Sequence, residues 1–472
     1  MKNFISIAVF YLVFTNGYTQ ELEPNVSRFV DVPSGLIALT NAAIIDGTGS
    51  AIQHNMTIVI DDKRIKEIIP SDHAVIPGEA RIINCTGKTV IPGLIMLHEH
   101  LCYPMHFENH SHFTLTTFTF SRLYLAGGVT TMRTTASLGI HQDLNLKQWI
   151  NEGKITGPKI DVTSPAIDRP GSNYTLMAYI NSSEQAGRMV EFWADMGVTS
   201  IKVYANVTRE DLKEVLKKAH ERNLKVTGHV GAVTHREAAD LGINNLEHGF
   251  WVSTDFVKDK IPDICPSWDR RSSSLLALDA DDPEMQDLIR HLIENSVALT
   301  STLNVFEPYT GREVVPGGGI EALTPLLREK VLESYASNVN NDSVKLMLFK
   351  KEMYWEKKFY DAGGLLLAGT DPTNPKVVAG YSNQHTLELF VEAGFTVAEA
   401  VNISTLNGAR YMGIDKETGS LENGKLADLV IINGDLEKDI SNIRNMDLVF
   451  KEGIGFNSKR MFESVKGQVG LN

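Results

Sequence analysis

Short apolar segments that alternate with helical patterns recur through the middle of the sequence. Two of the stretches between them, 209–222 and 398–411, carry apolar residues at helical spacing. Eight segments are predicted to be strands: 90–98, 129–134, 159–163, 200–204, 225–229, 245–248, 298–303 and 365–370. Eight strands that alternate with helices are what a (β/α)8 barrel requires, so an α/β fold of the TIM-barrel type is expected.

The two ends of the chain have a different pattern. Residues 36–69, 425–433 and 448–453 contain short β-branched runs with Asp-Gly and Asp-Asp turn signals. Neither end is long enough to form its own core, so together they are expected to form one small β-sandwich. The expected domains are therefore a composite sandwich from residues 20–90 and 416–472, and a barrel from residues 91–415.

The first residues have the pattern of a secretory signal peptide. Lys2 precedes the apolar run FISIAVFYLVF at 4–14, and small residues follow at 17–20. Cleavage after Thr19 would remove residues 1–19, and the protein would be exported to a periplasm or out of the cell. A buried N-terminal helix is the alternative. The remaining sequence has no apolar run of eighteen residues, so no membrane span is expected.

The charge of the chain limits its partners. The formal net charge is -13, whereas nucleic-acid binding usually requires a basic face. No nucleic-acid partner is therefore expected, and a small-molecule substrate is. A homo-oligomer stays open, because the sequence shows no interface.

Two connections between predicted strands are long, at 253–296 and 308–363. Loops of this kind build sites and lids on barrel enzymes. The second contains Gly317, Gly318 and Gly319, followed by helix-forming sequence through Lys358. It is a candidate for a segment that closes over a substrate, and whether either connection is a mobile lid stays open.

The end of the first predicted strand carries the sequence His98-Glu99-His100. Residues two apart on a strand point to the same side, so both imidazoles are able to reach one cation. A single pair of this kind also occurs by chance and in ordinary cores. Its place at the C-terminal end of a barrel strand favours a metal site.

Other predicted strands end in residues of the same chemical type. The additional candidates are Lys202, His229, His248 and Asp371. Each has an ordinary explanation, such as a strand-end charge, a core histidine or a turn residue. Their convergence on one face of the barrel favours a functional site instead.

The set of motifs resembles the amidohydrolase superfamily. Within it, the chain resembles the imidazolonepropionase-like and Xaa-Pro dipeptidase-like members that have a binuclear metal centre. The motifs that carry the resemblance are VIPGLIMLHEH, GGVTTMRTT, IKVYAN, VTGHV, NLEHG, LAGTD and GSLENGKLADLVIING. They occur in the order expected for the superfamily and extend over residues 36–455. The resemblance is specific in combination, although each motif alone is common.

The resemblance implies a ligand set for two divalent metal ions. One ion would be held by His98, His100 and Asp371, and the second by His229 and His248, with a carboxylated Lys202 as the bridge. An ammonium group would be repelled by two dications, whereas a carbamate offers an oxygen to each. Imidazole and oxygen ligands favour Zn2+, with manganese, iron and cobalt as alternatives.

The chain departs from the superfamily pattern at two positions. Met96 stands where an acidic residue often precedes the first histidine, and Thr134 follows Arg133 where an aspartate is common. Neither position holds an expected ligand. The departures therefore leave the metal site intact and put its surroundings and the subfamily in doubt.

The resemblance also implies a reaction. A metal-bridged hydroxide would attack the amide or peptide bond of a small substrate such as a dipeptide or an N-acyl amino acid, with Asp371 as general base. The alternatives are a lactone, ester or phosphotriester hydrolase, and a mononuclear deaminase or imidazolonepropionase-like enzyme. Lys202 argues against the mononuclear enzymes, and the complete ligand set argues against a non-catalytic binding protein.

Substrate contacts are less well specified by the sequence. Tyr204 is a candidate to hydrogen-bond the scissile carbonyl, Arg169 to hold a substrate carboxylate, and His385 to line the pocket. The ordinary alternatives are packing inside the barrel for Tyr204 and a solvated loop for Arg169. His106, His110 and His112 fit no familiar closed metal site, so a surface or lid loop is expected there.

Overall fold

The computed structural model describes residues 22–107, 110–172, 174, 176–338 and 343–470. The predicted signal peptide, residues 1–19, lies outside this range and stays a prediction. Within the described part of the chain, none of the helices combines the length and the apolar character that a bilayer crossing requires.

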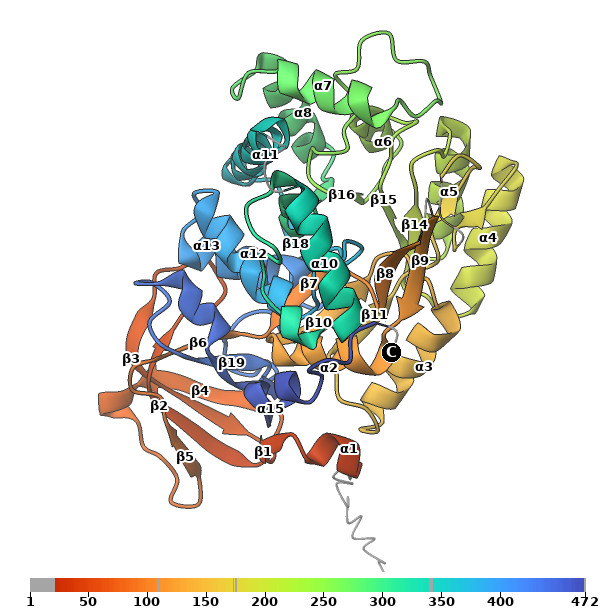
Figure 1. The fold of residues 1–472 in the computed structure, drawn as a ribbon. Helices are drawn as coiled ribbons and strands as arrows, with labels where there is room; N and C mark the ends of the chain where they lie inside the picture. Colours follow the sequence, from red (N-terminus) through yellow and green to blue (C-terminus); the bar gives the residue numbers. More distant parts are fainter. Residues whose placement is uncertain (1–21, 108–109, 173, 175, 339–342, 471–472) are drawn as a thin grey trace, which may run out of the picture.

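The middle of the chain forms parallel strands in two sheets (Figure 1). The first has the order β11-β10-β7 and the second the order β13-β12-β14-β15-β16-β17-β18. The strands are β7 (Leu94–Glu99), β10 (Val129–Thr134), β11 (Lys159–Val162), β12 (Ile167–Asp168), β13 (Ala178–Tyr179), β14 (Ser200–Val203), β15 (Lys225–Gly228), β16 (Asn245–Glu247), β17 (Ala298–Ser301) and β18 (Leu366–Ala368). The two sheets meet on both sides, because a parallel bridge joins Thr163 to Ser200 and β18 lies against β7.

Eight of these strands match the eight segments predicted from the sequence, with one correction. The segment 90–98 is not one strand. It divides at Gly93 into β6 (Lys88–Pro92), which belongs to another sheet, and β7. A β-carbon at Gly93 would lie 2.8 Å from the β-carbon of Thr130, so only glycine allows this close approach to β10.

Both chain ends contribute to a single nine-stranded sheet, visible in Figure 1 as red-orange and blue strands side by side. Its strands are β1 (Val30–Val32), β2 (Leu36–Ile44), β3 (Gln53–Asp61), β4 (Arg64–Pro70), β5 (Arg81–Asn84), β6, β19 (Leu429–Asn433), β20 (Met446–Lys451) and β21 (Ile454–Asn457). The link between the ends is the antiparallel pairing of β6 with β19, which places Val90 opposite Ile431. The sheet has its own apolar cluster, which includes Leu39, Ile60 and Phe450.

The described residues form fifteen α-helices, several of which pack against the parallel strands. They are α1 (Pro24–Ser27), α2 (Thr117–Ala126), α3 (Ile140–Asn151), α4 (Ser183–Asp195), α5 (Arg209–Glu221), α6 (His235–Asp240), α7 (Trp268–Ala277), α8 (Pro283–Glu294), α9 (Leu303–Phe306), α10 (Pro325–Asn338), α11 (Ser343–Asp361), α12 (Tyr381–Glu392), α13 (Val397–Ile403), α14 (Leu406–Met412) and α15 (Ser458–Glu463). The predicted helix at 398–411 is therefore two helices, α13 and α14. The interruption falls at Thr405, which has φ -137° and is not helical.

The long connections and the histidine-rich segment also have regular structure. Helices α7 and α8 occupy the connection 253–296, and α10 and α11 occupy 308–363, after three glycines as predicted. The histidine-rich segment is not an irregular loop. It forms a hairpin of β8 (Cys102–Phe107) and β9 (His110–Leu115), paired antiparallel.

Candidate active site

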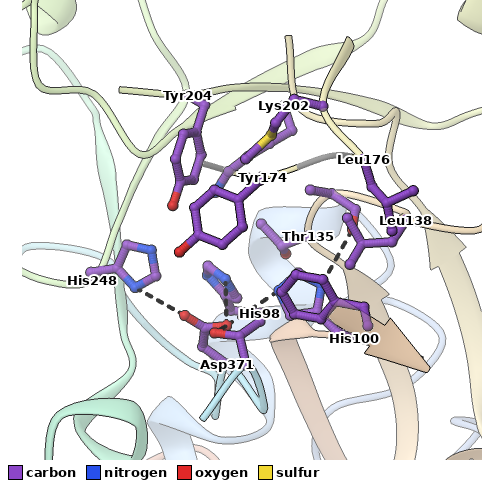
Figure 2. A pocket seen from close by; sticks show the side chains of 14 residues that line it. His98, His100, Thr135, Leu138, Tyr174, Leu176, Lys202, Tyr204, His248 and Asp371 are labelled. Atoms are coloured by element: carbon purple, nitrogen blue, oxygen red, sulfur yellow. Dashed lines mark hydrogen bonds and ion pairs between the residues drawn. The ribbon is translucent and has the colours of Figure 1, made fainter. Parts of the chain in front are cut away.

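A pocket opens at the C-terminal ends of the parallel strands (Figure 2). Five of the six predicted metal ligands line it, namely His98, His100, Lys202, His248 and Asp371, whereas His229 is not among the lining residues. They come from β7, β14, β16 and β18 or from the first three residues after these strands. The C-terminal ends of parallel strands meet at one edge, which is why residues far apart in sequence converge there.

The ends of β7 and β18 are joined by the backbone. The carbonyl oxygen of His98 accepts hydrogen bonds from the N–H groups of Thr370 and Asp371, at 3.2 and 3.0 Å. Gly369 makes this approach possible, since a β-carbon there would lie 2.8 Å from the nitrogen of His98. Asp371 is thereby placed beside the histidine pair.

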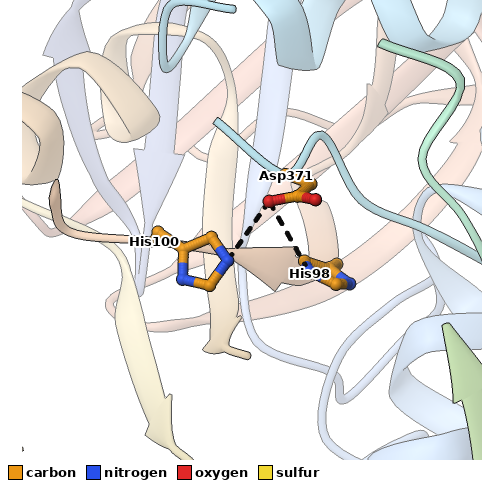
Figure 3. A group of neighbouring side chains, drawn as sticks. All are labelled: His98, His100 and Asp371. Carbon is orange, nitrogen blue, oxygen red and sulfur yellow. Dashed lines mark ion pairs between the residues drawn. The ribbon is translucent and has the colours of Figure 1, made fainter. Parts of the chain in front are cut away.

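His98, His100 and Asp371 form a cluster with the donor types of a metal site (Figure 3). One potential ligand atom of each lies within 4.8 Å of the others, and all three residues are buried. Asp371 Oδ1 lies 3.3 Å from His100 Nε2 and 3.7 Å from His98 Nε2. Two imidazoles and one carboxylate are a donor set that suits zinc and its neighbours.

Hydrogen bonds on the far side of both rings orient them. His98 Nδ1 lies 2.7 Å from Glu247 Oε2, and His100 Nδ1 lies 3.2 Å from the carbonyl oxygen of Ala136. A ring that donates from Nδ1 presents Nε2 as its acceptor. Both Nε2 atoms are the ones closest to Asp371, so the rings are set to offer a lone pair to one cation.

Glu247 is a functional residue that the sequence reasoning missed. It is fully buried at the end of β16, directly before His248, and Arg133 Nη2 donates to its Oε1 at 3.0 Å. Burial alone would raise the pKa of Glu247, but Lys202, His98 and Arg133 hold it well below its usual range. An acidic residue next to a candidate ligand was the available signal. Arg133, the residue before the departure at Thr134, is thus part of the support of His98.

His248 and His229 lie next to each other, and His248 also lies beside His98. The ring centroids of His229 and His248 are 4.7 Å apart, and those of His98 and His248 are 4.6 Å apart. His248 Nδ1 lies 2.8 Å from Thr302 Oγ1 and 3.7 Å from Asp371 Oδ2. The four predicted imidazoles therefore form one continuous group, in which His98, His100 and His248 approach the carboxylate and His229 contacts His248.

The backbone of the site is held in an uncommon conformation at two positions. His248 has φ 69° and Asp371 has φ 49°, both in the left-handed region that side chains other than glycine rarely adopt. Such conformations persist where surrounding contacts fix them, and they concentrate at functional sites. The backbone after β16 and β18 therefore adopts an uncommon conformation that directs the side chains of His248 and Asp371.

Lys202 is buried in the middle of the group without a hydrogen-bond partner. Its side chain is 1% exposed, and Nζ forms no hydrogen bond within the described part of the chain. Its ion pair with Glu247 is long, with 3.9 Å between Nζ and Oε1. Burial lowers the pKa of Lys202 to about 8. A buried amine left without a partner is costly, so an additional group at this position would resolve the cost.

Glu99, between the two histidines, points away from the pocket and supports β18. Its carboxylate accepts from the backbone N–H of Thr370 at 3.1 Å, from the Thr370 hydroxyl at 2.5 Å and from Asn383 Nδ2 at 3.0 Å. Burial raises the pKa of Glu99 to about 8. Alternation along β7 thus gives two histidines on one side and a structural acid on the other.

Of the predicted substrate contacts, Tyr204 lines the pocket together with a residue that the sequence reasoning missed, Tyr174. Their rings lie 5.9 Å apart in a T-shaped arrangement. In Figure 2 both hydroxyl groups point toward the side of His248 and Asp371. Tyr174 lies in an irregular loop, and the sequence offered no signal for its position.

Arg169 and His385 do not line this pocket. Arg169 is engaged by Asp211, at 2.6 and 2.8 Å, in a bidentate pair at the start of α5. His385 lies between Glu307 and Glu388, 2.7 Å and 2.5 Å away. Both side chains therefore have structural partners in place of the predicted substrate contacts.

Comparison with known proteins agrees with this geometry. Residues 89–455 match the model of the amidohydrolase family. Imidazolonepropionase from Geobacillus kaustophilus (strain HTA426) is 26% identical over 424 residues, with 81% of this chain and 84% of the relative covered.

Two solved structures share the fold. Bottromycin amidohydrolase has a TM-score of 0.70 at 20% identity, with coverage of 95% of this chain and 93% of the other. A Xaa-Pro dipeptidase with bound methionine has a TM-score of 0.66 at 20% identity, with coverage of 90% and 100%. The family match extends over most of the chain and includes every residue of the site. The chain therefore belongs to the amidohydrolase family and is a hydrolase that acts on carbon–nitrogen bonds.

Proposed function

We propose that this chain uses two divalent cations to hydrolyse an amide or peptide bond of a small substrate such as a dipeptide or an N-acyl amino acid. The favoured metal is Zn2+. The observation that carries the proposal is the buried group of His98, His100 and Asp371, with His248 and an unpartnered Lys202 beside it. The first three residues would hold one cation, and His229 and His248 the second.

A carboxylated Lys202 would complete the set. Its buried nitrogen without a hydrogen bond fits a lysine that carries an added carboxylate, because the modified side chain loses its positive charge and gains two acceptor oxygens. An unmodified ammonium group would instead repel both cations. The donors present therefore fit a bridged pair of cations.

The cations, when bound, would lower the pKa of a water molecule and polarise the carbonyl group of the substrate. Asp371 is placed to accept a proton from that water and to pass it to the leaving nitrogen. Although burial alone would raise its pKa, the neighbouring His98, His100 and His248 hold the pKa of Asp371 well below its usual range. Thr373 Oγ1 donates to Asp371 Oδ1 at 2.8 Å and fixes the carboxylate.

A second candidate is a cyclic-amide hydrolase of the imidazolonepropionase type with one metal ion. The similarity to the imidazolonepropionase from Geobacillus kaustophilus favours it. A single ion would need only His98, His100 and Asp371 as ligands. The buried Lys202 would then have no role. A lactone, ester or phosphotriester hydrolase would use the two-metal site on another bond.

We further infer that the two parallel sheets close into one (β/α)8 barrel across residues 91–415. The bridge between Thr163 and Ser200 and the contact of β18 with β7 support this inference. The segments 20–90 and 416–472 would form the second domain, a sandwich in which the nine-stranded sheet folds over its own apolar cluster. Export after removal of residues 1–19 is proposed from the apolar N-terminal segment alone.

Metal analysis of the purified mature protein and of Lys202→Ala tests the proposal. Two equivalents of zinc or a similar ion, with a clear fall in the variant, are expected. Lys218→Ala is the matched control, because Lys218 lies on the surface of α5 in pairs with Glu191 and Glu221. One equivalent that Lys202→Ala leaves unchanged would favour the mononuclear candidate, and no bound metal would contradict both.

A further inference from the structure

One part of the pocket wall is apolar. It consists of Phe113, Leu138, the ring of Tyr174, Leu176 and Met177. These side chains come from β9, from the segment after β10 and from the segment after β12, so three separate parts of the chain supply the same chemistry. In Figure 2 Leu138 and Leu176 lie next to each other on the side of His100.

The fold holds this wall in place. Tyr179 donates from its hydroxyl to the carbonyl oxygens of Ser172 and Tyr174, both at 2.8 Å, and thereby fixes the segment that carries Tyr174. The ring of Tyr174 lies 6.1 Å from that of Phe113 on the β8–β9 hairpin. The apolar wall is thus built by contacts between the hairpin and the loop, before any substrate enters.

Apart from the candidate ligand Lys202, the described side chains that line the pocket offer a substrate carboxylate no free guanidinium or ammonium group. Among the described residues that line it, Lys202 is the one lysine and no arginine is present. Arg169, which the sequence suggested as a partner for a substrate carboxylate, is held by Asp211. The side chains that the structure does not describe in 105–111, 173, 175 and 337–343 include no lysine or arginine either. A carboxylate against this wall would lose its hydration without gaining a partner.

We propose that the substrates are small, uncharged amides that carry an aromatic or branched apolar group next to the scissile bond and no free carboxylate. The proposal rests on the proposed function and narrows it away from dipeptides and free N-acyl amino acids. The apolar group would lie against Leu138 and Leu176, while the hydroxyls of Tyr174 and Tyr204 would remain to hydrogen-bond a neutral carbonyl.

Affinity for a matched pair of metal-binding hydroxamates tests this inference without turnover. One compound is benzylsuccinic acid monohydroxamate, and the other has its carboxylate converted to a carboxamide of the same size. Calorimetry on the metal-loaded protein is expected to give at least tenfold tighter binding of the neutral compound. Equal or tighter binding of the carboxylate would overturn the inference.

A variant pair locates the effect. Leu176 lies at the rim with 39% of its surface exposed, so Leu176→Arg has room for its guanidinium group. This variant is expected to bind the carboxylate at least tenfold more tightly than the wild type does, whereas Leu176→Gln, polar but uncharged, is expected not to. A like gain in both variants would contradict the charge argument.

Turnover provides a second measurement. N-acetylphenethylamine and N-acetylphenylalanine differ only in the carboxylate, and the first is expected to have the higher kcat/KM. A higher kcat/KM for the acid would contradict the proposed substrate class. The proposed function is tested separately, by the metal content. A protein with two metal ions that prefers the acid would overturn the substrate class alone.

Discussion

Glu352 accepts a hydrogen bond from the backbone N–H of Phe250, with 2.7 Å between Oε1 and N. Phe250 follows His248 by two residues, and both His248 and Gly249 have positive φ angles, 69° and 58°. A buried acid on α11 thus holds the turn that directs a candidate metal ligand. Glu356 lies one helical turn later on α11 and is equally buried.

The first prediction concerns this turn. Glu352→Ala would leave the N–H of Phe250 buried without an acceptor, at a cost of about 1–3 kcal/mol. His248 would lose its fixed direction, so we expect lower metal content as well as a lower melting temperature. Both are measured on the same purified protein by metal analysis and thermal unfolding.

Glu356→Gln is the matched control for the Glu352 prediction. Its amide is able to donate to Glu352 and keeps the size of the side chain, so the turn at His248 is preserved. We expect its metal content to equal that of the wild type. Equal loss of metal in both variants would show that Glu352 acts through helix packing alone.

The second prediction concerns Glu247. Because its carboxylate lies 2.7 Å from His98 Nδ1, Glu247→Gln removes a charge that orients this ring and strengthens it as a ligand. Loss of such a partner lowers metal affinity by about 10- to 100-fold. Competition with a chelator of known affinity measures the change. The control is Glu67→Gln, an exposed acid on β4, and an unchanged affinity in Glu247→Gln would contradict the assigned role.

The third prediction is a dependence of stability on pH. Burial lowers the pKa of His385, but its hydrogen bonds with Glu307 and Glu388 raise it to about 9, above the ordinary value of 6.5. Arg444 also approaches His385 Nδ1, at 3.4 Å, and is itself paired with Glu388. A raised pKa in the folded state stabilises the fold fully below pH 6.5, and this contribution is lost as the pH rises toward 9.

Urea unfolding of wild type and His385→Gln at several pH values between 6 and 9 checks this dependence. The wild type is expected to lose about 3 kcal/mol over this interval, since one pKa unit corresponds to about 1.4 kcal/mol. The variant is expected to lose less. Parallel curves for the two proteins would exclude His385 as the source.

The fourth prediction separates two interpretations of Arg169. If it bound substrate, Arg169→Ala would raise KM. Because it pairs with Asp211, which also belongs to the capping box of α5, we expect instead a loss of stability of about 1 kcal/mol with kcat/KM unchanged. Thermal unfolding and steady-state kinetics with one neutral amide distinguish the two interpretations.

The ligand-type residues were predictable because strand alternation and the convergence of parallel strands are local or general rules. The spacing of His98 and His100 and the position of Asp371 after a strand follow from these rules. The position of Tyr174 could not be predicted from these rules. Its loop is fixed by contacts of Asp168 with Ser172 and with Asn206, and Asn206 lies far from the loop in sequence. The division at Gly93 also depends on a distant contact, with Thr130.

The final prediction concerns the contact that joins β18 to β7. Gly369→Ala would place a β-carbon 2.8 Å from the backbone nitrogen and 3.0 Å from Cα of His98, so one of the two strand ends must move. Crowding of this kind costs about 1–3 kcal/mol. The movement would also separate Asp371 from the two histidines. We therefore expect a lower melting temperature together with a loss of tightly bound metal. Gly78→Ala is the control, because a β-carbon there meets no atom within 4 Å. If Gly369→Ala kept its metal while losing stability, the close approach would serve the fold and not the geometry of the site.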